Sequence, residues 1–511
     1  MLLIETLSPD KLGILAYTSS ALLAFGAYLV YAAFSPSTKG SIRKLGGFPV
    51  LTAWSFFTKR YDFLWSNFAK SADPHFRFQV LQHQVVALRG EEARQVFFDT
   101  KSLDFTEGYK ILMGASPSLD DIDVKTKFAN EGVSFFNKQL AILFTNKRRL
   151  SDSKVGYSIH DWFLISLPLL FDDVNRRMVM WGKEGRMDPF KDIYDLVFQM
   201  TTRMASCDEL SKDLDAISEI QKLYWMLEKS ATPTALLLPW FPSRAKKNKE
   251  IATKELFMKL KGFVDMRREA KVPSSDAIDI LIGQGQSTPE IVQFILSVVF
   301  AGVINTGINS CWALVFMSSH PEWKVKAKAE VDAMIEKHTN TTSGDPLHKR
   351  LSAVPVSVWE EEMPVMELII RETLRLVMST AALRRNILED LTVSKGVIKP
   401  GDFVAYSVAD AHRNPNIYRQ PDEFDPDRFS PGREEDKKAT FAFLGWGAGR
   451  HPCTGMKVAK LEIKLILAMM LAGYDFDIVD KAGKAPKEIP QPDRNDIHQV
   501  RPIFFLFRFS F

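Results

Sequence analysis

A long, nearly uninterrupted apolar pattern with a helical start runs from Ser287 to about Ser319. Ser287 is a suitable N-cap and Pro289 fits the first turn, so we predict a helix of roughly 45 Å at ~1.5 Å per residue. Because apolar residues cover nearly every face, the helix must be buried. Polar residues within the run and a charged helix expected at 321–335 favour a core helix over a membrane span.

Shorter patterns predict other elements. Alternation of apolar and polar residues from Phe76 to Arg89 indicates two strands, and a helical pattern extends from Glu91 to Phe98. Two further strands are expected about the Lys399–Asp402 turn, and another from Val500 to Leu506. The segment from Thr106 to Val124 contains glycine and proline without a clear period, so it is predicted to be a long loop.

The N-terminal pattern is typical of a membrane anchor. Residues 12–34 contain no charged side chain, and about twenty such residues span a bilayer core. A cleaved signal peptide is the alternative, but the run is longer than the usual apolar part of such a peptide. Basic residues are more frequent after the run, which directs the downstream part of the chain to the cytosol. We divide the chain into a short non-cytosolic terminus (1–11), a transmembrane anchor (12–34), a basic hinge rich in proline and glycine (35–50) and one folded domain (51–511).

Composition narrows the classes of function. The chain has 511 residues, of which 46% are hydrophobic, so it can bury a large core. A net charge of +4 gives no support for nucleic-acid binding, which requires a concentrated basic face. The cysteines Cys207, Cys311 and Cys453 are far apart in sequence, which argues against a disulfide framework and a zinc site. Reduced thiols fit a domain that faces the cytosol.

One of these cysteines lies among glycines directly before a helical pattern. Gly447, Gly449 and Gly455 flank Cys453, and glycine permits tight turns and close backbone approach. The helix expected from Met456 places backbone N–H groups near the sulfur, which favours a thiolate. A lone intracellular cysteine is usually a small buried hydrophobe, but this spacing of glycines and cysteine rarely arises by chance.

The segment resembles the haem-binding loop of the cytochrome P450 family, F-G-x-G-x-x-x-C-x-G, and particularly the sterol 14α-demethylase branch, with Trp446 replacing the opening phenylalanine. The resemblance implies the cytochrome P450 fold, mainly α with smaller β-sheets, and haem b with Cys453 as its axial thiolate ligand. It also places three residues at the haem propionates. These are Arg148, in a W-x-x-x-R motif whose tryptophan is replaced by phenylalanine, Arg384, with the next arginine as a competitor, and His451.

Glu372 and Arg375 are three residues apart on a predicted helix, so they share one face. By themselves they indicate a surface ion pair of little energy. They also match the family's E-x-x-R signature, and Arg428, in Phe-Asp-Pro-Asp-Arg-Phe, resembles the arginine that completes this element. The resemblance implies a buried network of the three side chains.

The centre of the long helix, residues 301–306, resembles the family's A-G-x-[DE]-T-T segment over the distal face of the haem. Ile304 stands in place of the acid and Asn305 in place of the first threonine. In the family the acid and the alcohol supply protons to the reaction, and isoleucine cannot donate. Asn305 and Thr306 are therefore the candidate catalytic residues, although Asn305 alternatively packs or holds a water. Asparagine at this place resembles the cholesterol 7α-hydroxylase and prostacyclin synthase branches.

The resemblance implies a monooxygenase of the endoplasmic reticulum membrane, single-pass with a cytosolic catalytic domain. It would take O₂ and electrons from NADPH through NADPH-cytochrome P450 reductase, with cytochrome b5 as a second donor. The expected substrate is lipophilic, a terpenoid, steroid or polycyclic alkaloid of specialised metabolism, and Tyr109, Ala301 and Ile304 are its candidate contacts.

Two alternatives remain open at the level of sequence. The Ile304–Asn305 pair also suits a haem-thiolate isomerase, dehydratase or rearrangement enzyme. Lys457, Lys460 and Lys464 share a helix face beside Cys453, which indicates either a docking face for an acidic reductase or a solvated surface.

Overall fold

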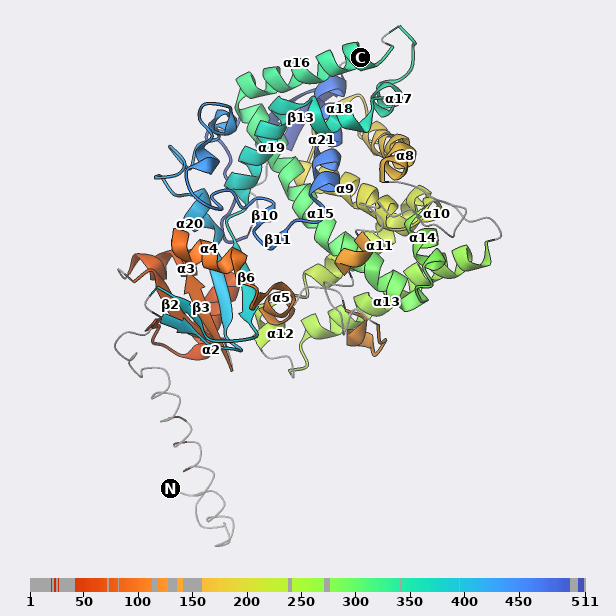
Figure 1. The fold of residues 1–511 in the computed structure, drawn as a ribbon. Coiled ribbons are helices and arrows are strands. Elements are labelled where there is room, and N and C mark those ends of the chain that lie inside the picture. The colour runs from red at the N-terminus through yellow and green to blue at the C-terminus, as the bar shows by residue number, and fades with distance from the viewer. Residues whose placement is uncertain are drawn as a thin grey trace, which may run out of the picture. The chain divides into compact units, whose positions relative to one another are not determined.

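The computed structural model describes residues 20, 23, 26, 42–70, 73–80, 82–112, 118–126, 136–140, 159–237, 241–270, 276–340, 342–394, 396–496 and 504–509 (Figure 1). The anchor expected at 12–34 lies almost wholly outside these residues, as does Arg148. Two compact units make up the chain. The sheet unit comprises residues 1–108 and 381–407, and the helical unit comprises 109–380 and 408–511.

Six strands form the main sheet of the sheet unit, in the order β1-β2-β3-β9-β6-β4. β2 and β3 pair antiparallel, so the two strands predicted between Phe76 and Arg89 are confirmed. β9 pairs parallel with β3 and antiparallel with β6. The bounds are β1 (Arg43–Lys44), β2 (His75–Val80), β3 (His83–Leu88), β4 (Leu103–Asp104), β6 (Ala381–Asn386) and β9 (Phe403–Ser407), with a separate pair β7 (Leu391–Val393) and β8 (Gly396–Ile398).

Helices pack on this sheet through aromatic side chains. α2 (Pro49–Thr58) and α3 (Arg60–Ala69) contact β2, and α4 (Glu91–Asp99) contacts β9. The ring centroids of Phe63 and Phe78 lie 4.9 Å apart, and those of Phe56 and Phe78 lie 5.0 Å apart. These residues are buried, so the apolar faces of strand and helix meet in one core.

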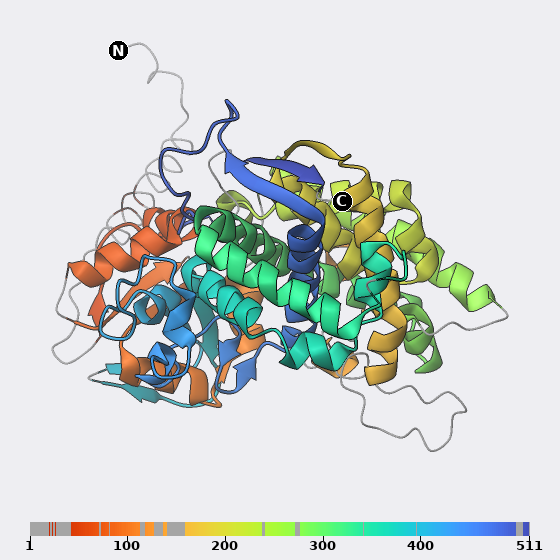
Figure 2. The ribbon, with the colours of Figure 1, turned by 90° about the horizontal axis from the view of Figure 1, so that it is seen from above.

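Helices dominate the helical unit. Its small sheet has the order β12-β13-β5, in which the blue arrows of β12 and β13 in Figure 2 lie beside a much earlier strand. Its elements are α8 (Ile159–Val179), β5 (Glu184–Met187), α9 (Pro189–Ala205), α10 (Asp208–Lys212), α11 (Leu214–Glu228), α12 (Pro233–Leu237), α13 (Arg244–Glu269), α14 (Ala277–Gly283), α15 (Thr288–Ser319), α16 (Pro321–His338), α17 (Leu347–Ser352), α18 (Val356–Glu361), α19 (Pro364–Val377), α20 (Val408–His412), η2 (Pro426–Phe429), η3 (Glu435–Lys437), β10 (Gly447–Ala448), β11 (His451–Pro452), α21 (Met456–Gly473), β12 (Tyr474–Val479) and β13 (Phe504–Phe509).

α15 is the central helix of this unit, as its pattern predicted. A capping box closes its start, because the Ser287 side chain accepts from the N–H of Glu290 while the Glu290 carboxylate accepts from the N–H of Ser287. α15 packs against α9, α13, α19 and α21. Within the described part of the chain it is the one helix long and apolar enough to cross a membrane, yet 72% of that apolar window is buried inside the protein. The prediction of a core helix is confirmed.

The loop predicted from Thr106 to Val124 is wrong in part. α5 (Phe105–Leu112) and a 3₁₀ turn, η1 (Leu119–Ile122), occupy much of it. Asp104 caps the first turn of α5, since its Oδ1 accepts from the Glu107 N–H at 2.8 Å. Gly108, which suggested a loop, instead lets the helix lie against the backbone of Arg384, where a Cβ would clash.

Candidate functional site

Cys453 lies directly after a tight hairpin in the helical unit. β10 pairs antiparallel with β11, with Gly447 opposite Pro452. Gly447 (φ 70°) and Gly449 (φ 57°) adopt the left-handed conformation, and a Cβ on Gly447 would lie 2.6 Å from the His451 carbonyl oxygen. The Cys453 N–H donates to the Trp446 carbonyl at 2.7 Å. The glycines therefore allow a turn whose geometry fixes the backbone that carries the cysteine.

Cys453 is the exposed one of the three cysteines, since Cys207 and Cys311 are buried. Although the residue reaches the surface, desolvation by the surrounding loop raises the pKa of the Cys453 thiol, and the Gly455 N–H opposes this only in part. The Gly455 N–H acts in the expected direction, since it lowers the pKa of the thiol, but desolvation has the larger effect. A coordinated metal ion would favour the thiolate over the thiol.

The residues expected around the sulfur differ in exposure. His451 is exposed, and Trp446 is half-buried. The indole Nε1 of Trp446 is buried and has no hydrogen-bond partner among the described residues. Lys460 Nζ lies 5.7 Å from the centroid of the same ring. Trp446 thus packs its ring in the loop while its N–H group stays unsatisfied.

Glu372, Arg375 and Arg428 form one fully buried network behind the loop, each with 0% of its surface exposed. Arg375 donates to both Glu372 oxygens, at 2.7 Å and 2.8 Å, and Arg428 Nε donates to Oε1 at 3.0 Å. Arg428 also donates to Glu435 at 2.8 Å. A surface ion pair is therefore the wrong interpretation of Glu372 and Arg375. Their charges are balanced by several partners in a water-excluded setting.

His412 connects this network to the cysteine loop, a role the sequence did not reveal. Its Nε2 accepts from the Leu444 N–H at 2.8 Å and its Nδ1 donates to the Met378 carbonyl at 3.0 Å. Its own carbonyl accepts from Arg375 at 2.7 Å. Burial, and then the positive charge of Arg375, lowers the pKa of His412 to about 3. The ring is therefore neutral and holds the start of the loop. The only signal in the sequence was its place shortly after a strand.

The middle of α15 presents a different face. Most of the helix is buried, but Ala301 and Asn305, one turn apart, are exposed and Ile304 is half-buried. Asn305 Nδ2 donates back to the Ala301 carbonyl at 3.0 Å. Thr306 is 2% exposed, and its hydroxyl is hydrogen-bonded to the Glu462 carboxyl group of α21. Asn305 and Thr306 are thus adjacent in sequence but lie in an exposed and a buried setting, respectively.

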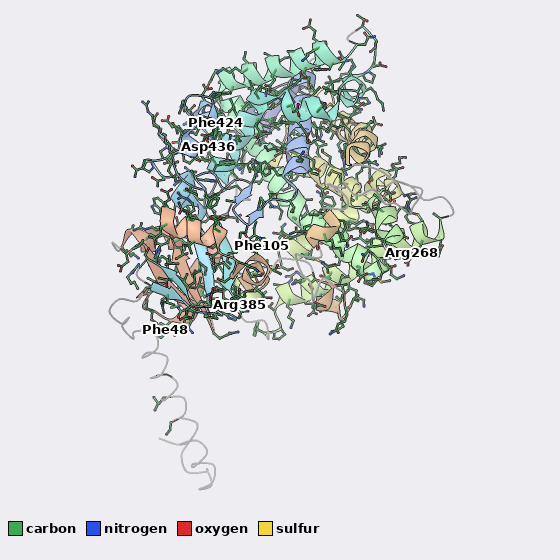
Figure 3. The ribbon with its side chains drawn as sticks, in the orientation of Figure 1. Phe48, Phe105, Arg268, Arg385, Phe424 and Asp436 are labelled. Atoms are coloured by element: carbon green, nitrogen blue, oxygen red, sulfur yellow. The ribbon has the colours of Figure 1, made fainter. Side chains whose placement is uncertain are left out.

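In the sheet unit, the two candidate arginines of β6 have different partners. Arg384 is buried, donates to the Leu383 carbonyl at 2.7 Å and lies over Phe105, whose ring centroid is 4.8 Å away. Arg385 pairs with Glu107 at 3.1 Å; Figure 3 labels both Phe105 and Arg385. Arg385 is thus paired with a carboxylate at the surface, whereas Arg384 is buried against an aromatic ring. Tyr109, the third candidate substrate contact, is half-buried at the start of the helical unit.

The three lysines beside the cysteine differ in exposure: Lys464 is buried, whereas Lys457 is exposed. Lys464 is buried, donates to the Trp359 carbonyl at 2.8 Å and lies 3.8 Å from Glu367. Lys460 also pairs with Glu367, and Lys457 pairs with Glu360 at 3.3 Å. For Lys464 both open interpretations, a docking face and a solvated face, are wrong, because its charge is used within the protein.

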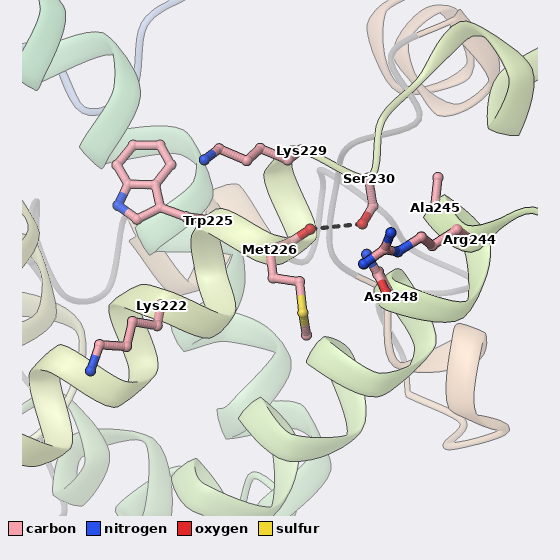
Figure 4. A pocket seen from close by; sticks show the side chains of 8 residues that line it. All are labelled: Lys222, Trp225, Met226, Lys229, Ser230, Arg244, Ala245 and Asn248. Atoms are coloured by element: carbon pink, nitrogen blue, oxygen red, sulfur yellow. Dashed lines mark hydrogen bonds between the residues drawn. The ribbon is translucent and has the colours of Figure 1, made fainter.

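A hollow of about 520 Å³ lies between α11 and α13 (Figure 4). Its lining combines three cations with apolar groups: Lys222, Lys229, Arg244, Trp225 and Met226. The Ser230 hydroxyl donates to the Met226 carbonyl at 2.7 Å at its edge. None of the residues singled out in the sequence lines it.

Comparison with known proteins places this chain in a family. The Cytochrome P450 family model matches residues 171–499. The cytochrome P450 monooxygenase AacuE of Aspergillus aculeatus is 29% identical, over 90% of this chain and 91% of that protein. Obtusifoliol 14-alpha demethylase of Sorghum bicolor is 29% identical over 58% of this chain and 60% of its own length. Among solved structures, retinoic acid-bound cyanobacterial CYP120A1 superposes with a TM-score of 0.69 at 18% identity, covering 93% of this chain and all of that one.

The chain belongs to the cytochrome P450 family. The fold, mainly α with smaller sheets, is the P450 fold, and the chain is an enzyme of a family whose similar members are named monooxygenases. The family implies haem with a cysteine thiolate ligand.

The residues of the helical unit fit such a cofactor. Cys453 is an exposed residue directly after a hairpin that contains two glycines in the left-handed conformation, and Pro452 beside it is also exposed. The half-open middle of α15 offers Ala301 and Ile304, which are small or apolar, as a flat macrocycle requires. A soft thiolate donor suits iron.

Proposed function

We propose that this protein is a membrane-anchored haem-thiolate monooxygenase with Cys453 as the axial ligand. One observation carries the proposal: of three cysteines, only Cys453 is exposed, and it stands on a glycine hairpin held by a fully paired buried network. A thiolate ligand donates electron density to iron and so suits the bound haem to cleave the bond of dioxygen. The relatives named as monooxygenases support this class of reaction.

The residues of the chain are proposed to bind the haem, to support the cysteine loop and to orient the substrate. Trp446 and His451 flank the ligand, and Arg384, Arg148 and His451 are the proposed propionate partners, in line with the family resemblance. His412 and the Glu372 network keep the loop in one conformation. Tyr109, Ala301 and Ile304 are proposed to contact the substrate, which is lipophilic: a terpenoid, a steroid or a polycyclic alkaloid. Asn305 and Thr306 are the proposed proton-handling groups.

Electrons are proposed to come from NADPH through cytochrome P450 reductase, with cytochrome b5 as a second donor. The anchor at 12–34 would hold the enzyme in the endoplasmic reticulum membrane with its catalytic domain in the cytosol, in specialised metabolism. Deleting residues 1–34 tests the anchor: we expect the truncated enzyme to leave the membrane fraction. Retention there would show that another part of the chain binds the membrane.

Spectroscopy tests the central assignment. The reduced, carbon-monoxide-bound wild type should show the thiolate spectrum, and Cys453→Ala should lose it. Cys207→Ala is the matched control, because Cys207 is buried and should leave the spectrum unchanged. An unchanged spectrum in Cys453→Ala would overturn the assignment.

A second candidate keeps the haem and changes the reaction to an isomerisation, dehydration or rearrangement. It is favoured by Ile304 and by Asn305, whose amide is bonded to its own helix rather than to a proton-donating partner. Turnover of purified enzyme without oxygen and NADPH distinguishes the two. Conversion under those conditions would support the second candidate, and strict dependence on both would support the monooxygenase.

A further inference from the structure

The hollow between α11 and α13 is a feature to which the proposed function assigns no role. Its volume of about 520 Å³ lies within the range of ~300–1,000 Å³ that is typical of small-molecule sites. Lys222 lies on α11, Lys229 is the C-cap of that helix, and Arg244 is the first residue of α13. Trp225 and Met226 supply the apolar part of the lining (Figure 4). The size and the mixed lining suit a small molecule with both a charged and an apolar part.

The three cations of the hollow have no carboxylate partner within the described part of the chain. Among the described residues that line the hollow none is acidic. The nearest acids of α11 do not neutralise them: Glu219 pairs with Lys259 at 2.5 Å, and the Glu228 Oε2 atom is buried without a hydrogen-bond partner among the described residues. Positive charge is therefore concentrated at the hollow, and a concave surface with charge of one sign attracts ligands of the opposite sign.

The first turn of α13 adds to this positive charge. Lys246 and Lys247 follow Arg244 directly, and the turn contains no acidic residue. Backbone N–H groups make the start of a helix partly positive, so cations there are unfavourable and acids are the usual residues. The ligand-free protein therefore carries an electrostatic cost beside the hollow, and an anion bound in the hollow would offset it.

The apolar part of the lining is held in place from behind. The Trp225 ring is half-buried and meets the buried rings of Tyr194 and Tyr224 edge-on, with centroids 5.6 Å and 5.2 Å away. Such contacts favour one orientation of the indole. Met226 is also half-buried, and its flexible thioether chain can adapt to ligands of different shape. A preformed aromatic surface thus lies next to the unpaired cations.

We propose that the hollow binds a lipophilic acid, a small molecule with one carboxylate and an apolar body. Lys222, Lys229 and Arg244 attract the carboxylate, for which the planar guanidinium group is well suited. Trp225 and Met226 contact the body of the molecule. None of the residues proposed to contact haem or substrate lines this hollow, so the inference does not depend on the proposed function.

Photo-crosslinking tests where the acid binds. A decanoate analogue that carries a diazirine is irradiated with the full-length enzyme in nanodiscs of neutral phosphatidylcholine, and mass spectrometry identifies the labelled peptides. We expect labelling within residues 222–230. Excess decanoate should compete, whereas decanol lacks the charge and acetate lacks the apolar body, so neither should compete. Absence of label from this segment, or equal competition by decanol, would overturn the proposal.

Substitutions test the role of the cations. Lys222→Gln and Arg244→Gln should each raise the decanoate concentration needed for half-maximal competition roughly tenfold, because each removes a charge-assisted contact. Lys254→Gln is the matched control, since Lys254 is exposed on α13 and does not line the hollow. The thiolate spectrum should be the same in all three variants. Equal competition curves for the wild type and both hollow variants would contradict binding by these cations.

The ligand-free stability of Arg244→Gln gives a second readout. Because the substitution removes an unpaired cation from the start of a helix, the melting temperature without decanoate should not fall. A clear fall would assign Arg244 to the stability of the fold and overturn its role as a binding residue. Nanodiscs that contain phosphatidylserine test the remaining alternative. If they suppress labelling as strongly as decanoate does, the hollow binds an anionic membrane surface and the proposal of a lipophilic acid fails.

Discussion

The cysteine loop and the middle of α15 belong to the same unit but are stabilised in opposite ways. Around the loop, Glu372, Arg375, Arg428 and His412 satisfy one another through many hydrogen bonds in a buried setting. In the middle of α15, the exposed side chain of Asn305 bonds only to its own helix among the described residues. The many hydrogen bonds fix the conformation of the cysteine loop, which suits it to hold a cofactor. The exposed side chains of α15 have fewer partners, so their conformations can adapt to a substrate. We therefore expect the residues that distinguish this enzyme from other members of its family to lie on α15.

Breaking the constrained region should have the largest effect. Glu372→Ala leaves two buried arginines without their carboxylate, so we expect a loss of roughly 3–5 kcal/mol in the free energy of unfolding. Chemical denaturation monitored by circular dichroism measures it. Glu361→Ala, at an exposed position, is the control and should change stability by less than about 0.5 kcal/mol. Equal effects of the two substitutions would contradict the buried network.

His412→Ala tests the connection between network and loop. It leaves the Leu444 N–H without its acceptor, so we expect a loss of about 2 kcal/mol and weaker haem retention. The pH dependence gives a second readout. Because the pKa of His412 is lowered to about 3, the unfolded chain binds the proton more tightly, and wild type loses stability as pH falls below about 6.5. The variant should lose part of this slope; an unchanged slope would contradict a neutral buried ring.

Asn305→Thr tests the exposed middle of α15. It replaces the exposed amide with the family's alcohol and should change stability by less than about 0.5 kcal/mol, because little packs on the side chain. In a monooxygenase we expect product per NADPH to rise by up to about tenfold. Asn305→Val, which has no hydrogen-bonding group, is the matched control. A similar gain in that variant would show that shape rather than the hydroxyl decides coupling.

Trp446→Phe should have the smallest effect, although the residue lies in the loop. The indole N–H is buried without a partner among the described residues, so removing it relieves a cost that offsets the lost ring area. We expect the melting temperature to change by no more than about 2 °C. Trp446→Ala, which removes the whole ring, should destabilise clearly more. Equal effects would show that the ring does not pack.

Local patterns predicted the fold well where one signal dominated. The capping box and apolar run of α15, and the alternation in β2 and β3, needed no tertiary information. α5 was missed because Gly108 serves a close approach to another strand, which composition cannot distinguish from a turn. His412 and Glu462 were missed for the same reason: their partners lie on other elements. The burial of Lys464 likewise depends on residues distant in sequence.

The hydrogen bond from the Leu444 amide to His412 also affects how fast the enzyme is inactivated over time. An amide held by a buried neutral imidazole exchanges its hydrogen with solvent only when the surrounding structure opens. If the Leu444 amide exchanges its hydrogen as slowly as the amides of the helix core, the loop does not unfold locally and opens only when the whole unit unfolds. Loss of haem and global unfolding would then be one event, and the lifetime of the loaded enzyme would be set by its unfolding rate.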